Sequence, residues 1–145
     1  MPTLAYALLG DYVRAEGGIA HVIAAGIDTI VAPQLPTGQN LALVANVRFT
    51  RAECGRPHRV EIIFTESDGE HLFRGSSVMT PVWAEDTPAH WGQGAQLALN
   101  LGVPLPRYGL YQFSLMVDDT EWATVPLRVV APVERPPAGN IEPTK

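Results

Sequence analysis

Apolar and polar residues alternate with a period of two along much of the chain. Five segments show this pattern: 41–50, 59–66, 97–103, 111–117 and 123–129. In the clearest of them, one face consists of Leu41, Leu43, Ala45, Val47 and Phe49. Period-two alternation marks a half-buried strand, and no window carries a clean helical stripe free of glycine and proline. The pattern therefore predicts β-strands at all five places.

Turn signals and shorter apolar runs add further strands. An Asp-Gly pair at 68–69 is a strong hairpin signal and leads to an expected strand at 71–79. Short apolar runs predict strands at 4–10 and 19–30, where glycines count against the helix that the alanines also allow. The turn-rich stretch 51–57 separates two strong strands, and we expect those two strands to pair as antiparallel neighbours.

About eight short strands separated by turns are typical of an all-β protein. We expect a two-sheet antiparallel β-sandwich, immunoglobulin-like or C2-like. Pro126 cannot donate a ladder hydrogen bond, so its strand is expected at an edge or with a bulge. The chain has 145 residues, 46% of them hydrophobic, which suits one domain. We place the β-sandwich domain at 1–131 and a flexible proline-rich tail at 132–145.

Charge and cysteine content narrow the compartment and the partners. The formal net charge of −5 argues against nucleic-acid binding, which needs a strongly basic face. A single cysteine, Cys54, rules out an internal disulfide. The apolar run 4–9 is too short for a secretory signal, and no run approaches the ~18 apolar residues of a membrane span. These features predict a soluble, cytoplasmic protein without a nucleic-acid or membrane partner.

Two segments carry a resemblance to a known family. The first reads ALLGDYVRAEGG at 7–18 and continues as AAGID at 24–28, and the second reads VPLPRYGLYQF at 103–113. Together they resemble a family of short, uncharacterised bacterial proteins, often actinobacterial, that form a domain of unknown function. The resemblance covers most of residues 4–131, implies a small β-sandwich without a known activity, and supplies no catalytic residue. The YGLY stretch of the second segment resembles the corner before a sandwich strand, where a tyrosine hydroxyl ties down a loop.

Few residues are arranged for catalysis or metal binding. Cys54 and His58 suit a Cys–His nucleophile pair or half of a zinc site, but neither an orienting group nor a second ligand pair is identifiable. The acidic residues considered for calcium lie in expected loops without a calcium-loop motif: Asp68, Glu70, Asp118, Asp119 and Glu121. A hydrolase using His90 with Glu85 or Asp86 is the remaining enzyme hypothesis. We expect no enzyme, no catalytic residue, no metal and no cofactor.

One basic cluster is formed by Arg48, Arg51, Arg56, His58 and Arg59. Such a cluster suits a phosphate or an acidic partner. The interleaved Glu53 and Glu61 favour a solvated mixed-charge surface instead, with Arg48 facing Glu61 across the expected strand pair.

The segment 80–94 is the best candidate for a binding loop, because it is long for a connection in a compact domain. It contains Trp83, His90 and Trp91, which we predict as ligand-binding or partner-binding residues. Exposed indoles with a polar handle suit protein interfaces or sugar stacking. The alternative is that both indoles fold back and cap the end of the sandwich.

The leading functional hypothesis is a non-enzymatic intracellular interaction or assembly module that self-associates or docks on a protein partner. Outward apolar residues, namely Val44, Ile63 and Met116, indicate a surface that a partner covers. Strand edges without lysine invite pairing, so we expect a homo-oligomer, most simply a two-fold dimer. Alternatively, the loop 80–94 covers these residues in a monomer. The second functional hypothesis is a small-ligand or carbohydrate-binding sandwich that uses Trp83 and Trp91.

Overall fold

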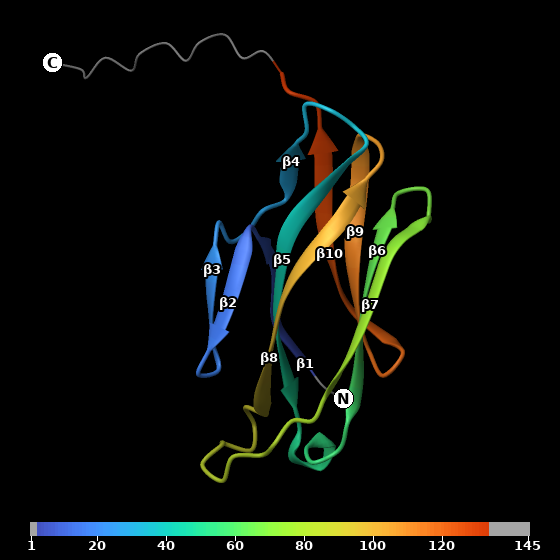
Figure 1. The fold of residues 1–145 in the computed structure, drawn as a ribbon. Coiled ribbons are helices and arrows are strands. Elements are labelled where there is room, and N and C mark those ends of the chain that lie inside the picture. The colour runs from blue at the N-terminus through green and yellow to red at the C-terminus, as the bar shows by residue number, and fades with distance from the viewer. Residues whose placement is uncertain (1–2, 134–145) are drawn as a thin grey trace, which may run out of the picture.

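The computed structural model describes residues 3–133, which form ten β-strands and one 3-10 turn, Arg51–Glu53 (Figure 1). The strands are β1 (Thr3–Gly10), β2 (Tyr12–Glu16), β3 (Ile19–Ile23), β4 (Thr29–Val31), β5 (Thr37–Phe49), β6 (His58–Glu66), β7 (His71–Met79), β8 (Gln93–Leu105), β9 (Gly109–Val117) and β10 (Thr120–Val130). The predicted all-β class is confirmed. Within the described part of the chain, no helix is long and apolar enough to cross a membrane. The tail predicted at 132–145 lies, from residue 134 onward, outside the described residues.

These strands form three sheets within residues 3–133. The first has the order β1-β5-β8, the second has the order β4-β10-β9-β6-β7, and the third is the hairpin β2-β3. Neighbouring strands are antiparallel except for β4, which runs parallel to β10. The antiparallel prediction is thus largely confirmed, but the described residues form three sheets and ten strands where we expected two sheets and about eight strands.

The two additional strands have different origins: a break in the backbone divides one expected strand, and β2 has too weak a sequence pattern to be predicted. The segment expected as one strand at 19–30 is divided into β3 and β4. Ala24 (φ 56°) and Gly26 (φ 87°) take the left-handed region, which interrupts an extended strand. The strand β2 has little alternation to reveal it, since only Val13 of its five residues is buried.

The strands β5 and β6 do not pair with each other, so the predicted antiparallel pair is wrong. They lie in the two different large sheets, and the 3-10 turn carries the chain from one sheet to the other. The backbone N–H of Thr50 donates to Glu53 Oε1 at 2.8 Å and caps this turn. A hairpin partner and a strand of the facing sheet both bury one row of side chains, so alternation alone does not separate the two arrangements.

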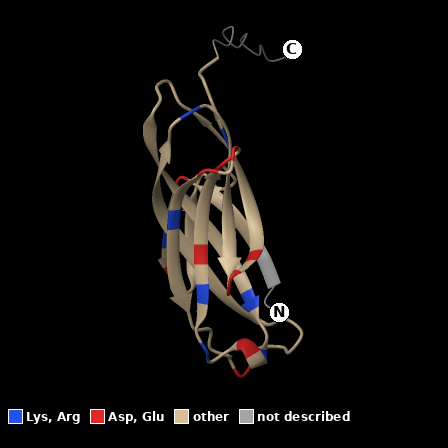
Figure 2. Ribbon diagram, turned by 90° about the vertical axis from the view of Figure 1, so that its right-hand side faces the viewer, with Lys and Arg blue, Asp and Glu red and all other residues tan. Residues whose placement is uncertain are grey.

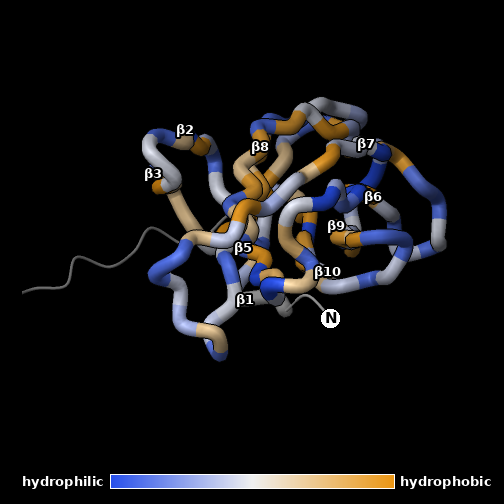
Figure 3. The backbone as a smooth tube through the Cα atoms, turned by 90° about the horizontal axis from the view of Figure 1, so that it is seen from below, coloured by the Kyte–Doolittle hydropathy of each residue, from blue (hydrophilic) through white to orange (hydrophobic). Residues whose placement is uncertain are grey.

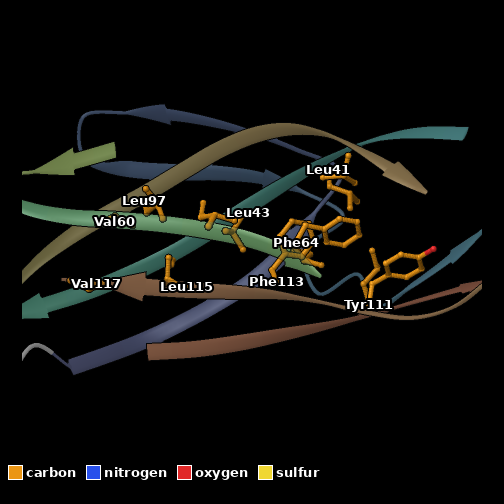
Figure 4. Close-up of a cluster of buried hydrophobic side chains, with 14 of the residues drawn as sticks. Leu41, Leu43, Val60, Phe64, Leu97, Tyr111, Phe113, Leu115 and Val117 are labelled. Carbon is orange, nitrogen blue, oxygen red and sulfur yellow. The ribbon is translucent and has the colours of Figure 1, made fainter. Parts of the chain in front are cut away.

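The apolar rows predicted to face inward form the core between the two large sheets (Figure 4). From the five-stranded sheet, the Phe64 ring lies 4.6 Å from the Phe113 ring and stacks on Tyr111 at 5.2 Å. From the three-stranded sheet, Leu41 and Leu43 are buried in the same cluster. Sequence alternation therefore predicted the core-facing side of these strands correctly.

The β2–β3 hairpin covers the outer face of the three-stranded sheet, on the side away from the core (Figure 3). Val13 of β2 packs there against Ala42 and Val44 of β5. Val44 is only 1% exposed. We expected a partner or the loop 80–94 to cover Val44, but the hairpin of the same chain covers it.

Two close contacts hold the hairpin in place. A Cβ at Gly10 would lie 2.6 Å from Val22 Cγ1, so the absence of a side chain at Gly10 allows the hairpin to fold onto the sheet. Asn100 of β8 accepts a hydrogen bond from the Val13 N–H (3.0 Å) and donates one to the Val13 carbonyl (2.9 Å). The Asn100 amide thus bonds to β2 much as a neighbouring strand would.

Replacing Asn100 by alanine is expected to loosen the hairpin without unfolding the sheets. The variant loses both hydrogen bonds to Val13, a loss of about 1–2 kcal/mol at roughly 1 kcal/mol per bond. Amide hydrogen exchange should become faster at Val13 and Val22 and stay unchanged at Phe113. Asn40→Ala on β5 is the matched control, because the Asn40 side chain is exposed and its side-chain amide makes no hydrogen bond within the described residues. Equal exchange in the two variants would contradict the anchoring role of Asn100.

Candidate functional site

An apolar recess of about 170 Å³ lies between β7 and β8, which are the last strands of the two large sheets on one side of the molecule. We call it the β7–β8 groove. It opens onto the core and is apolar apart from two serines on its rim. Its lining residues are Val60, Ile62, Phe73, Gly75, Ser76, Ser77, Leu97, Leu99 and Leu101.

The groove is open because β7 brings few large side chains to it. Phe73 is half-buried, whereas Ser77 is small and exposed. A Cβ at Gly75 would lie 3.4 Å from the Phe73 ring, so that ring lies close to the bare backbone of Gly75. On the facing strand, Leu99 and Leu101 remain only half-buried. Part of the core is therefore accessible along this side.

The groove is bordered by the two longest unpaired strand edges. At the opposite edges, β4 has only three residues, and β1 packs beside β10 with an irregular register between Leu4 and Tyr6. Short length, irregularity, lysine and proline commonly protect sheet edges from pairing. Among the edge strands that border the groove, β8 contains Pro104, whereas β7 contains neither proline nor lysine. The edge of β7 is therefore protected by neither of these residues, and its one irregularity is a register shift at Leu72, near the start of the strand.

Pro126 illustrates the same rule on the other side of the five-stranded sheet. It lies in β10, between β4 and β9, but β4 pairs only with Arg128, Val129 and Val130. Within the described residues, no strand therefore pairs with β10 at Pro126 on the β4 side. The predicted edge position is confirmed at this residue, while the register shift of β10 lies between Glu121 and Ala123.

The predicted binding loop joins β7 to β8. Gln93 anchors this loop, because Gln93 Oε1 accepts hydrogen bonds from the Ala84 N–H (3.0 Å) and the Thr87 hydroxyl (3.1 Å). Trp83 is half-buried, whereas Trp91 is 60% exposed, so the two indoles have different environments.

His90 is exposed, and its ring lies edge-on to the Trp91 ring at 6.2 Å. Within residues 3–133 no hydrogen bond joins His90 to Glu85 or Asp86, so the structure shows no support for the hydrolase pairing considered from the sequence. Beside Trp91 an open recess of about 300 Å³ is lined by Arg48, whose guanidinium donates to the Trp91 carbonyl at 3.3 Å.

The three residues predicted as an interface lie on two different faces. Val44 is under the hairpin, whereas Ile63 and Met116 lie on the outer face of the five-stranded sheet. Ile63 is 9% exposed and Met116 is half-buried. These residues therefore do not form one continuous surface.

Charged residues lie along the strands of the five-stranded sheet (Figure 2). The buried Glu61 carboxylate lies 2.7 Å from the Arg74 guanidinium and 3.4 Å from that of Arg59. Arg48 belongs to the other sheet, so the expected pairing of Arg48 with Glu61 is wrong.

His58 is buried and held from both sides. Its Nδ1 lies 2.6 Å from Asp118 Oδ2, and its Nε2 lies 2.7 Å from the Glu53 carbonyl oxygen. Both partners are acceptors, so the protonated imidazolium, in which both ring nitrogens donate, satisfies both contacts. Burial alone would lower the pKa of His58, but the hydrogen bonds to Glu53 and Asp118 outweigh burial and raise it. The hydrogen bond from His58 in turn lowers the pKa of Asp118.

The Cys54 thiol does not form an activated pair with His58. Both nitrogens of His58 are engaged by other groups, and burial together with the charge of Glu53 raises the pKa of Cys54. A raised pKa leaves less of the nucleophilic thiolate. The His58 contacts instead connect the 3-10 turn, the start of β6 and the β9–β10 turn.

An acidic cluster lies at the β6–β7 turn, where oxygens of Glu66, Asp68 and Glu70 lie within 4.8 Å of one another. Arg107 holds all three carboxylates: its Nη2 lies 2.5 Å from Glu66, 3.6 Å from Asp68 and 3.3 Å from Glu70. Hydrogen bonds to Glu66, together with this negative charge, raise the pKa of Arg107 above its usual range. The cluster is thus an arginine-centred ion-pair network.

The groove was not predicted from the sequence. A glycine inside a strand marks close approach of another group or a missing side chain, and Gly75 was the available signal. The row of Leu97, Leu99 and Leu101 was recognised as a strand face. Alternation did not reveal that two of these leucines are only half-buried.

These features define an all-β protein with two facing sheets and an added hairpin, whose candidate site is an apolar groove between unpaired strand edges. The chain belongs to DUF6941, a family of unknown function, whose model matches residues 5–130. The resemblance to a domain of unknown function is thereby confirmed. No curated protein matches the chain.

Proposed function

We propose that this protein is a non-enzymatic, intracellular interaction module that accepts an extended strand in the β7–β8 groove. The observation that carries the proposal is the coincidence of an apolar groove with two unpaired strand edges. An added strand pairs its backbone with one edge and sets alternate side chains into the groove, which is the mode of β-strand addition. The strand comes from a protein partner or from another copy of the chain.

The volume of the groove limits what it accepts. A cavity of about 150 Å³ admits a benzene ring, so 170 Å³ accommodates one aromatic or branched aliphatic side chain. Leu97, Leu99 and Leu101 provide an apolar wall for that side chain. The expected occupant is therefore an extended segment with one large apolar residue between smaller neighbours.

Replacing Ser77 by lysine tests this function. Ser77 lies on β7 and lines the groove, so a lysine there opposes both edge pairing and burial of an apolar side chain. The matched control is Thr124→Lys, which makes the same change of charge at an exposed position on β10. Binding of the immobilised protein to a second copy or to host proteins should weaken about tenfold or more in Ser77→Lys, equivalent to about 1.4 kcal/mol. Identical binding profiles for the wild type and both variants would rule out the groove as the site.

A second candidate function rests on Trp91. Its indole is 60% exposed beside Arg48, at the open recess of about 300 Å³. A carbohydrate or other small ligand stacking on this indole is the second proposal. A ligand screen read by tryptophan fluorescence tests it independently of the groove.

We also propose that the two facing sheets form an immunoglobulin-like sandwich. The Tyr111 hydroxyl donates to the Arg107 carbonyl (2.5 Å) and accepts from the Arg107 N–H (3.2 Å). A tyrosine hydroxyl bonded to the backbone a few residues upstream characterises the tyrosine corner of that class. Tyr111 therefore supports this assignment.

A further inference from the structure

We propose that the occupant of the β7–β8 groove is a second copy of this chain, whose β7 pairs antiparallel with β7 about a two-fold axis near Gly75. This inference rests on the proposed function, because it uses the same edge and groove. It adds the identity of the partner, the strand that pairs and the symmetry. The argument comes from the edge of β7, from the side chains near its middle and from the charges at its ends.

The edge of β7 is self-complementary. It has nine residues, it pairs with β6 on one side only, and it contains neither proline nor lysine. Two identical strands related by a two-fold axis are antiparallel, so the N–H groups of each copy face carbonyl groups of the other. The pairing joins the two five-stranded sheets into one continuous sheet and covers the open side of both grooves.

Side chains near the middle of β7 fit this symmetry. Gly75, Ser76 and Ser77 are small, so identical residues can meet at the axis without a steric collision. With the axis at Gly75, Arg74 of one copy lies opposite Ser76 of the other and does not meet a like charge. Arg74 is already paired, since its Nε donates to Glu61 at 2.9 Å. No like-charge contact therefore opposes the pairing at its centre.

Charges at the ends of β7 favour the antiparallel orientation. The carboxylates of Glu66, Asp68 and Glu70 lie next to the His71 end of the strand. A parallel arrangement would bring the two clusters together, whereas the antiparallel arrangement separates them by about 30 Å for nine or ten residues of strand. That separation is several times the screening length of about 8 Å at physiological salt. The other end of β7 is apolar at Val78, which is 64% exposed.

Light scattering and symmetric disulfide trapping test the proposal together. The wild type should have twice the monomer mass of 15.7 kDa at micromolar concentration. In a Cys54→Ser background, Gly75→Cys carries a single thiol on the axis, directly opposite the same thiol of the second copy; a Cβ at this position makes only a close contact with the Phe73 ring, at 3.4 Å. Directly opposed residues lie about 4.5–5.5 Å apart, which is within disulfide range. Gly75→Cys should therefore form a covalent dimer under mild oxidation. The matched control Val31→Cys, on the exposed edge strand β4, should form at least about tenfold less.

The outcomes separate this inference from the proposed function. A mass of 15.7 kDa at micromolar concentration overturns the second copy as occupant. If that monomer still captures another protein in a way that Ser77→Lys abolishes, the groove function stands and the partner differs. A dimer that cross-links through Val31→Cys and not through Gly75→Cys overturns the β7 pairing. A monomer that captures nothing through the groove overturns both proposals.

Discussion

Val44→Glu is expected to destabilise the fold by about 3–5 kcal/mol, because it buries a charge without a partner. Val44 is 1% exposed under the hairpin and packs in a small cluster with Val13 and Ala42. The glutamate forces the hairpin off the sheet or remains buried and uncompensated. The midpoint of urea unfolding should fall accordingly, and amide exchange in β2 and β3 should become fast.

Val31→Glu is the matched control for this experiment. Val31 also lies in a strand, but it is 58% exposed, so the same substitution should change stability by no more than about 0.5 kcal/mol. The two variants distinguish a core position from an interface position. A Val44→Glu protein as stable as Val31→Glu but newly monomeric would place Val44 at an intermolecular contact, contrary to the structure.

His58→Ala is expected to cost about 2–4 kcal/mol at pH 6, because it removes one buried and one partly buried hydrogen bond and the ring that packs 4.7 Å from Phe49. It leaves the Glu53 carbonyl and the Asp118 carboxylate without this donor. His21→Ala, at an exposed position of β3, is the matched control and should be near neutral. Thermal or urea unfolding of both variants measures the difference.

The same network predicts how stability depends on pH. The folded-state pKa of His58 is raised, so its contribution is complete below the unfolded pKa of about 6.5 and is lost as pH rises through the folded value. The folded-state pKa of Asp118 is lowered, so its contribution is present above about pH 4 and is lost as pH falls through the folded value. Wild-type stability should therefore decrease from pH 6.5 toward pH 9. Glu53 and Arg56 also lie close, and Arg56 opposes the raised pKa of His58.

His58→Ala should remove most of the decrease above pH 6.5, because no group at that position then titrates. Asp118→Asn should weaken the same dependence, since it removes the charge that favours the imidazolium. An unfolding free energy that falls as steeply above pH 6.5 in His58→Ala as in the wild type would show that another group causes it.

The inward rows were predictable because the core-facing residues of each strand that lines the core must be apolar. Val60, Ile62 and Phe64 face the core, and the residues between them face the other side of the sheet, because successive side chains of a strand point to opposite faces. The pairing of strands was harder to predict, since β5 and β6 point toward the same core from opposite sheets. Their alternation is the same whether they are neighbours or face each other.

The sequence pattern did not reveal that the hairpin covers Val44, and it did not reveal the groove at β7, for a related reason. Apolar residues on an outer strand face indicate that something covers them, but the pattern does not say whether a partner or another part of the chain does so. Val13 is the single buried residue of β2 and leaves almost no periodic signal. The groove exists because β7 has no large side chain at Gly75 and Ser77. A hydrophobic pattern shows which apolar side chains are present, so it did not reveal this gap. The loop that holds Trp83 and Trp91 was recognised by length and composition, which say nothing of how far each indole is buried.

The parallel pairing of β4 with β10 also has a consequence for synthesis of the protein. Thr29, Ile30 and Val31 pair with Arg128, Val129 and Val130, which the ribosome adds about a hundred residues later. At a synthesis rate of about 5–20 residues per second, β4 remains without its neighbour for several seconds or longer. Such distant pairings also make a β-protein fold slowly, on the millisecond-to-second scale. The sheet is therefore completed only after β10 has been synthesised, and until then the nascent chain presents unpaired strands to chaperones and to other chains.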